Sequence, residues 1–208
     1  MGRLAAFWAA AALLGLAVHV ARAQESSSLG LYVGGGIGIA TIRQDPGPDT
    51  GYRGLSRKNF GWDAFIGVRP LPYLGAEIGY LDFGSANSGY RPGFEVTGHA
   101  SANAPAAFAV GYLPVQQRWD LYLKAGAARL HRTWDFVPYC PPYAQCPAIL
   151  LQEYRDDTTQ WDLAWGVGTQ WKLGQVALRL QYERVNTRGN AIEGDPDLLS
   201  AGVSWMFF

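Results

Sequence analysis

The feature that most constrains the fold is a two-residue alternation that recurs from Gly30 to the end of the chain. In residues 161–171 every odd position is large or β-branched, and every even position is polar, Ala or Gly. A period of two residues indicates a β-strand, because successive side chains point to opposite faces. In most segments the second face is poor in large side chains. This combination predicts a barrel with lipid outside and a polar lumen.

Turn residues divide the alternating region into eight segments. These are Gly30 to Ile42, Asn59 to Val68, Tyr73 to Phe83, Glu95 to Tyr112, Trp119 to Trp134, Thr159 to Lys172, Val176 to Thr187, and a last segment that includes Leu199 to Phe207. The connections are long after the first, third, fifth and seventh segments and short after the others, as in barrels with long outer loops and short periplasmic turns. We therefore predict an all-β fold, an eight-stranded antiparallel up-and-down transmembrane β-barrel in the cell outer membrane.

The alternation also predicts which face of each segment meets the lipid. We expect the face with the larger apolar residues to point outward, and glycines to cluster where a narrow lumen leaves little room. For the fourth segment this rule places Ala106, Phe108, Val110 and Tyr112 outside. Aromatic residues should form two girdles at the membrane interfaces. The girdle candidates are Trp62, Tyr80, Tyr112, Trp119, Trp161, Trp171, Tyr182 and Trp205.

The N-terminus has the pattern of an export signal. Arg3 precedes an apolar run from Leu4 to Val20, and Ala21-Arg22-Ala23 has the small-x-small pattern that a signal peptidase reads. We predict a cleaved signal peptide over residues 1–23 and a barrel over 24–208; the alternative is an N-terminal membrane anchor. Cleavage removes two arginines and no acid, which changes the net charge from 0 to −2. Because the sequence has no basic stripe, we predict no nucleic-acid partner.

Two cysteines, Cys140 and Cys146, lie in the longest non-periodic stretch. An exported chain meets an oxidising compartment, so we predict a disulfide between them, with free thiols as the alternative. No His or further Cys lies nearby to complete a zinc site. Acidic loop residues such as Asp45 and Asp195 could bind Ca²⁺, but scattered loop acids are usually solvated. We predict no metal and no cofactor.

Charged side chains on the inward faces cannot stay unpaired in a weakly solvated lumen. We therefore predict that they form an interior charge network. Its members are Asp63, Glu77, Lys124, Asp162, Arg179 and Glu183. Eight strands leave little free width, which favours a structural plug over a conducting path.

Several strand motifs resemble the OmpA transmembrane barrel family in order and spacing. These motifs span residues 74–80, 110–114, 120–126, 178–182 and 200–205. The resemblance implies an eight-stranded barrel whose lumen is plugged by charged side chains, and the charges of the family are matched here by Glu77, Lys124 and Arg179. Two positions depart from the family: it often has Lys where this chain has Ala109, and Glu where this chain has Gln181. Full-length relatives continue into a periplasmic peptidoglycan-binding domain, and we expect the barrel alone here.

The resemblance also implies that the barrel-assembly machinery recognises the C-terminal strand through Trp205, Phe207 and Phe208. A second comparison concerns residues 99–103, because small outer-membrane lipid A deacylases have a similar architecture and use a His and a Ser. Extending the alternation of the fourth segment puts His99 and Ser101 in the lumen, whereas those enzymes work at the lipid-facing surface. His131 is expected to be an interfacial or loop side chain. We therefore predict no enzymatic activity.

The function predicted from the sequence is a structural or surface-interaction role in the cell envelope. Expected partners are outer-membrane lipids, lipopolysaccharide and the assembly machinery. Two alternatives remain open at this stage, a small low-conductance pore and a lipid-modifying enzyme. Loop chemistry is where such barrels diverge, so the surface ligand does not follow from the sequence.

Overall fold

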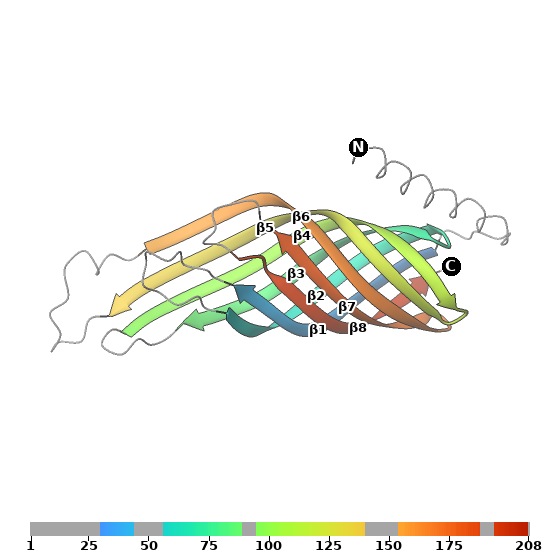
Figure 1. The fold of residues 1–208 in the computed structure, drawn as a ribbon, viewed down its shortest axis with the longest axis horizontal. Helices are drawn as coiled ribbons and strands as arrows, with labels where there is room; N and C mark the ends of the chain where they lie inside the picture. Colours follow the sequence, from blue (N-terminus) through green and yellow to red (C-terminus); the bar gives the residue numbers. More distant parts are fainter. Residues whose placement is uncertain (1–29, 44–55, 89–94, 140–153, 188–193, 208) are drawn as a thin grey trace, which may run out of the picture.

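The computed structural model describes residues 30–43, 56–88, 95–139, 154–187 and 194–207. They form a single closed antiparallel barrel in which each strand pairs with the next and β1 pairs with β8 (Figure 1). The strands are β1 (Gly30–Arg43), β2 (Ser56–Leu71), β3 (Leu74–Ser88), β4 (Glu95–Gln116), β5 (Trp119–Tyr139), β6 (Tyr154–Leu173), β7 (Val176–Asn186) and β8 (Asp197–Phe207). The predicted fold class is confirmed.

Three short turns connect the strands at one end of the barrel (Figure 1). They consist of residues 72–73, 117–118 and 174–175. Gly174 has a φ of 71°, which an L side chain adopts only with strain, so the last of these turns depends on glycine. The first was expected at residues 69–72, but Arg69 and Pro70 continue β2 after a register shift. The long connections leave the opposite end, so the predicted alternation of lengths is confirmed.

Two predicted features lie outside the described residues. They are the signal peptide over residues 1–23 and the cysteine pair Cys140 and Cys146. The part of the chain that is described contains no helix of sufficient length and apolarity to cross a membrane.

Large apolar side chains cover the outside of the barrel. In seven of the eight segments they lie on the face that the alternation predicts. Exposed residues of this kind include Leu31, Ile37, Phe60, Ile66, Ile78, Leu123, Trp161, Leu180 and Val203. An apolar band that would be unfavourable in water is stable against acyl chains, and this places the barrel in a bilayer.

The fourth segment is the exception, and its predicted orientation is wrong. Ala106, Phe108, Val110 and Tyr112 are all buried in the lumen, while the intervening small residues of β4 face outward. The prediction assumed that the larger residues of a segment face the lipid. In β4 the larger residues face inward instead.

Glycines on the neighbouring strands explain this reversal. Phe108 lies opposite Gly126 of β5, and a Cβ added to Gly75 of β3 would be 3.1 Å from the Tyr112 ring. Elsewhere in the lumen, Tyr32 occupies the space beside Gly67 in the same way. Large inward side chains therefore fill the volume that inward glycines leave free, as close packing of the interior requires.

The lumen changes character along its axis. Toward the short turns it contains charged and hydroxyl-bearing side chains, whereas toward the long connections apolar side chains predominate around the buried charged residues Arg132, Asp162 and Asp197. The apolar part includes Ala40, Ile42, Leu81, Phe83, Ala102, Ala104, Ala128, Leu130, Val185 and Leu198, all buried. The sequence analysis predicted a polar lumen, which holds for only part of it. Eight strands enclose a space that side chains fill, and residues excluded from water there can be apolar.

The strands differ greatly in length on the side of the long connections. β4, β5 and β6 have 22, 21 and 20 residues, against 11 each for β7 and β8. The ladder between β5 and β6 continues to Phe136 and Tyr154, whereas the ladder between β6 and β7 ends at Leu163 and Asn186. β4 to β6 therefore extend well beyond β7 and β8 (Figure 1).

Candidate functional site

The candidate site is a buried polar cluster midway along the lumen, and Glu77 of β3 lies at its centre. Glu77 Oε1 accepts hydrogen bonds from Tyr32 Oη and from Arg179 Nη1, each at 2.9 Å. Its other oxygen, Oε2, is 3.2 Å from Lys124 Nζ. Glu77 and its two cationic partners are each no more than 2 % exposed at the side chain. A carboxylate removed from water in this way is stable only with such compensation.

Lys124 of β5 connects Glu77 to a second group of acids. Its ammonium lies 2.6 Å from Glu183 Oε1 and 3.3 Å from Gln181 Oε1. The Gln181 amide donates to Asp63 Oδ2 at 2.9 Å and to Glu183 Oε2 at 3.3 Å. These contacts join strands on opposite sides of the barrel.

Aromatic side chains surround the cations of this cluster. The Arg179 guanidinium lies 4.2 Å from the ring centroid of Phe65 and 4.5 Å from that of Tyr122. Arg179 Nε donates to Tyr122 Oη, which in turn donates to Gln181 at 2.9 Å. Lys124 Nζ is 5.1 Å from the Phe108 ring. Desolvated cations gain on the order of 2 kcal/mol from such ring contacts, so the aromatics support the charges as well as filling space.

Five of the six residues predicted to form the interior network lie together in this cluster, and the sixth, Asp162, lies elsewhere on the lumen wall. Contacts among the central group link Asp63, Glu77, Lys124, Arg179 and Glu183, with Gln181 as the bridge to Asp63. Asp162 is buried on the inward face of β6, where it faces Ala128 across the ladder, and it has interactions of its own. The contacts of the central group described above do not include it. The predicted network did not include Tyr32 and Tyr122, although the alternation places both on inward faces.

A second polar cluster closes the lumen near the short turns, and sequence reasoning did not identify it. Asp120 of β5 is fully buried, and its Oδ2 accepts from Arg69 Nη1 at 2.7 Å and from Gln170 Nε2 at 2.9 Å. Its Oδ1 is 3.0 Å from Lys172 Nζ. Arg69 also packs over the Tyr112 ring at 4.0 Å. Asp120 and Gln170 occupy inward positions of the predicted alternation, so that pattern could have identified them.

The predicted aromatic girdles need one correction. Trp62, Tyr80, Trp119, Trp161, Trp171 and Trp205 are exposed on the outer surface, and Tyr182 is partly exposed there. Tyr112 is not a girdle residue, because it points inward and its hydroxyl lies 2.8 Å from that of Tyr32. Its misplacement follows from the reversed orientation of β4.

The expected lumen position of Ser101 is also wrong. Ala102 and Ala104 are the buried, inward residues of this part of β4, so Ser101 belongs to the outward face. His99 lies in a stretch whose side chains are not among those described. The reversal likewise puts Ala109 on the outward face, so it is not a lumen position. His131 is partly exposed near the outer end of β5, where Nδ1 lies 2.9 Å from Thr159 Oγ1 and 3.4 Å from Asp157 Oδ1.

The remaining predicted positions lie at the two ends of the barrel. Trp205 and Phe207 of β8 are exposed beside the short turns, and Phe208 lies outside the described residues. At the other end, partial burial acts to raise the pKa of Asp195, but hydrogen bonds from Arg184 and Thr187 lower that pKa below its usual value. The described ranges contain no group of three or more potential metal ligands.

In this geometry the charged side chains fill the lumen and cross-link the barrel wall. The carboxylates of Glu77 and Glu183 and the cations of Lys124 and Arg179 are committed to one another at hydrogen-bond distance. They are also sealed from water by aromatic rings on one side and apolar side chains on the other. Such an arrangement holds the barrel closed around a dense interior.

Solved structures with a similar fold come from several bacterial outer membranes. Ail of Yersinia pestis, solved in complex with the heparin analogue sucrose octasulfate, aligns with a TM-score of 0.57 and 15% identity over 86% of this chain and 99% of that chain. Neisserial surface protein A aligns with a TM-score of 0.54 and 18% identity over 85% and 97%. OprG of Pseudomonas aeruginosa aligns with a TM-score of 0.51 and 11% identity over 88% of this chain and 97% of that chain. At these identities the likeness concerns the fold.

Sequence comparison points to the same class of protein. Outer membrane protein A of Klebsiella aerogenes is 29% identical over 212 residues, which cover 95% of this chain and 53% of that protein. The chain thus spans about half the length of this curated relative. The profile of the family described as outer membrane protein beta-barrel domain matches residues 9–207. The chain therefore belongs to the outer membrane protein beta-barrel domain family, and its location is the cell outer membrane.

Proposed function

We propose that the protein is a sealed outer-membrane barrel that anchors surface loops and has no transport or catalytic activity of its own. The observation that carries this proposal is the filled lumen. The polar cluster around Glu77 occupies the middle, and apolar side chains such as Phe83 and Leu130 fill the part toward the long connections. A third seal, around Asp120, closes the end with the short turns.

Two layers of different chemistry make an open path unfavourable. Opening the polar layer would separate buried charges, at a cost of several kcal/mol per ion. The part of the lumen beside Phe83 and Leu130, both of which are essentially inaccessible to solvent, is lined mainly by apolar side chains, and its charged residues Arg132, Asp162 and Asp197 are themselves buried. The membrane-embedded part therefore acts as a rigid frame, which leaves the surface role to the outer end.

Planar-bilayer recording tests this proposal. The wild-type barrel is expected to give no sustained openings, and Glu77→Gln is expected to behave in the same way because the apolar layer remains in place. The matched positive variant is Phe83→Gly with Leu130→Gly, combined with Glu77→Gln, which removes two large side chains from the apolar layer and a central charge from the polar one. Sustained wild-type openings that change with Glu77→Gln would contradict the sealed barrel and support the pore.

The role at the cell surface is supported by the outer end of the barrel. Four connections, residues 44–55, 89–94, 140–153 and 187–196, join the strands at that end, where β4 to β6 are the longest strands. Similar barrels are envelope and surface proteins. Deleting residues 141–145 together with 89–94 should abolish adhesion of cells to a host or abiotic surface while leaving the barrel folded.

Absence of lipid-modifying activity is part of the same proposal. Ser101 faces outward, so its orientation no longer argues against such an activity, and a direct test is needed. Mass spectrometry of lipid A from cells with the wild-type protein, with Ser101→Ala and without the protein should give one acyl pattern. A pattern that changes with the wild type and reverts with Ser101→Ala would establish an enzyme.

We further propose that β8 carries the signal for barrel assembly. Trp205 and Phe207 lie on its outward face beside the short turns, and β8 supplies the edge that closes on β1. Replacing both residues with Ser should reduce outer-membrane insertion in cells but not folding into detergent. The matched control is Leu199→Ser at the opposite end of the same face, which should insert normally.

A further inference from the structure

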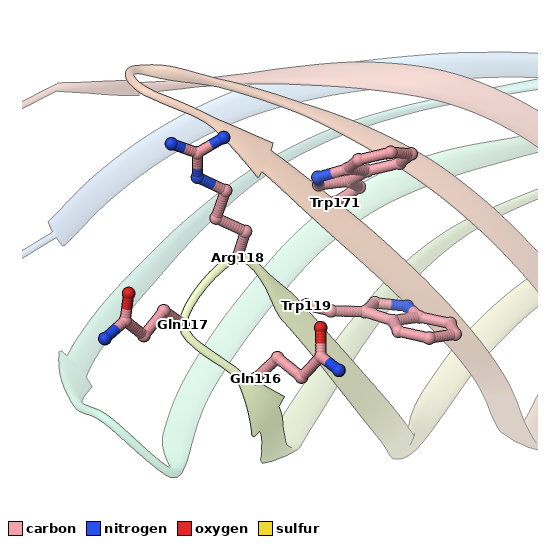
Figure 2. Close-up of a pocket in the computed structure, with 5 residues that line it drawn as sticks. All are labelled: Gln116, Gln117, Arg118, Trp119 and Trp171. Carbon is pink, nitrogen blue, oxygen red and sulfur yellow. The ribbon is translucent and has the colours of Figure 1, made fainter.

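A groove on the outer surface lies beside the turn between β4 and β5, at the end of the barrel with the short turns. Its volume is about 740 Å³, and its lining consists of Gln116, Gln117, Arg118, Trp119 and Trp171. Figure 2 shows the Arg118 side chain and the Trp171 indole on one side of this space, with Trp119 and Gln116 across from them. It is separate from the lumen clusters.

The groove lies where the apolar band of the barrel ends. Trp119 and Trp171 are cross-strand partners in the last rungs of β5 and β6, and both are about half exposed. Toward the middle of the membrane they are followed by exposed Leu121 and Val167. In the other direction the chain reaches the polar turn residues. Paired indoles at such a boundary mark the headgroup level of a bilayer.

Arg118 is the charged residue of the groove. Unlike Arg69, which pairs with Asp120 inside the barrel, Arg118 has no carboxylate partner within the described parts of the chain. No acidic residue is among the five that line the groove, and two glutamine amides add hydrogen-bond donors. A planar guanidinium presents donors that match a phosphate group, so the lining has the charge and the geometry for a phosphate ester.

The frame of the groove is held by hydrogen bonds within the barrel. Lys172 N donates to Arg118 O at 2.7 Å, which ties the turn to β6. Trp119 Nε1 donates to Thr169 Oγ1, which fixes its indole against the same strand. The groove is therefore formed before a ligand arrives, and little ordering is required on binding.

We propose that this groove binds the headgroup of a glycerophospholipid from the periplasmic leaflet. The phosphodiester lies against the Arg118 guanidinium and the glutamine amides, and an acyl chain lies along Trp119 and Leu121. Position argues for a lipid as the source of the phosphate, because the groove lies at the level of the headgroups and its two tryptophans border the apolar band that begins at Leu121 and Val167. This inference does not depend on whether the lumen conducts, so the two proposals can fail separately.

Lipid titration of the folded full-length barrel tests the proposal. The barrel is purified in a non-ionic detergent, dioctanoyl-phosphatidylglycerol is added, and native mass spectrometry measures the bound fraction. Arg118→Gln should weaken binding about tenfold, the effect of losing one charge-assisted hydrogen bond. The matched control is Arg129→Gln, since Arg129 is exposed on the outward face of β5 beyond the apolar band. It should bind as the wild type does.

Two further arms identify the ligand and the role of the indoles. Trp171→Ala should also weaken lipid binding, whereas Trp161→Ala, at the opposite girdle, should not. A large excess of inorganic phosphate should leave the bound lipid in place. Unboiled migration on a gel verifies that each variant is folded. Equal binding by wild type and Arg118→Gln, equal loss in Arg129→Gln, or displacement by inorganic phosphate would each overturn the proposal.

Discussion

Lys124 Nζ lies 2.6 Å from Glu183 Oε1, and this ion pair joins β5 to β7 across the lumen without involving β6, the strand between them. The same ammonium lies 3.2 Å from Glu77 Oε2 on β3. One cation thus connects three strands that share no ladder with one another. The interior cross-links the barrel wall independently of its backbone hydrogen bonds.

Removing this cation should strongly destabilise the barrel. Lys124→Met leaves Glu77 and Glu183 buried without their shared partner, and we expect a loss of about 3–5 kcal/mol in the free energy of unfolding. Urea unfolding in lipid vesicles measures it. Lys58→Met, at an exposed position of β2, is the control and should change stability by less than about 0.5 kcal/mol. The double variant Lys124→Met with Glu183→Gln should lose less than the two single losses combined; simple additivity would contradict the coupling.

Phe108 gives a direct test of the inward orientation of β4. Phe108→Ala removes a ring packed in the lumen beside Lys124, and we expect a loss of about 3–5 kcal/mol from the cavity that remains. Leu123→Ala, on the outward face of β5, should cost less because acyl chains fill the space. Urea unfolding of the two variants in the same vesicles shows which substitution causes the larger loss in the free energy of unfolding. A larger loss for Leu123→Ala would mean that Phe108 faces the lipid.

Two glycines on neighbouring strands should respond in opposite ways to the same substitution. In Gly126→Ala the new Cβ would collide with the carbonyl oxygen of Ala107, so the yield of folded barrel should fall severely. Gly111 faces outward, and its nearest neighbour for a Cβ is Leu123 O at 3.9 Å. Gly111→Ala should be neutral or gain up to about 1 kcal/mol, because alanine loses less backbone entropy on folding. Heat-modifiable gel migration compares them, and equal yields would be inconsistent with the crowded lumen.

Acidification should weaken the connection between β7 and β8. The lowered pKa of Asp195 means that its ionised form stabilises the folded state at neutral pH. This contribution is present above the pKa of the unfolded chain and is lost as the pH falls through the lower folded-state pKa. Asp195→Asn should therefore destabilise the barrel by at most about 1 kcal/mol at pH 7, with the difference vanishing in strong acid. The variant and wild type are compared by thermal unfolding across this pH range; a difference that grows in acid would contradict the assignment.

The strands were predictable wherever lipid and lumen select different side chains. In β6, tryptophans and other large residues alternate with Asp162, Gly166 and Gln170, and the two faces separate as the sequence implies. In β4 the rule fails, because side-chain size alone does not reveal the side on which a neighbouring strand has a glycine. That information is in the pairing of Phe108 with Gly126, which one segment does not contain.

The candidate site was predictable only in its charged members. Inward charges such as Glu77 and Arg179 stand out in an alternating segment, but a tyrosine in the same position is indistinguishable from a packing residue. Tyr122 becomes part of the polar cluster because Arg179 and Gln181 lie within hydrogen-bond distance across the lumen. The apolar part of the lumen was not foreseen either, because a single strand does not reveal whether the residues it faces, such as Phe83 or Leu130, exclude water.

The unequal strand lengths make one side of the outer end of the barrel taller than the other. At about 3.3 Å of rise per residue, the ten additional residues of β5 relative to β7 correspond to about 30 Å of extra strand before tilt is considered. On the side of β4 to β6 the sheet therefore extends much farther from the short turns than it does on the side of β7 and β8. The described strands therefore make the outer end of the barrel asymmetric, with β4 to β6 forming its taller side.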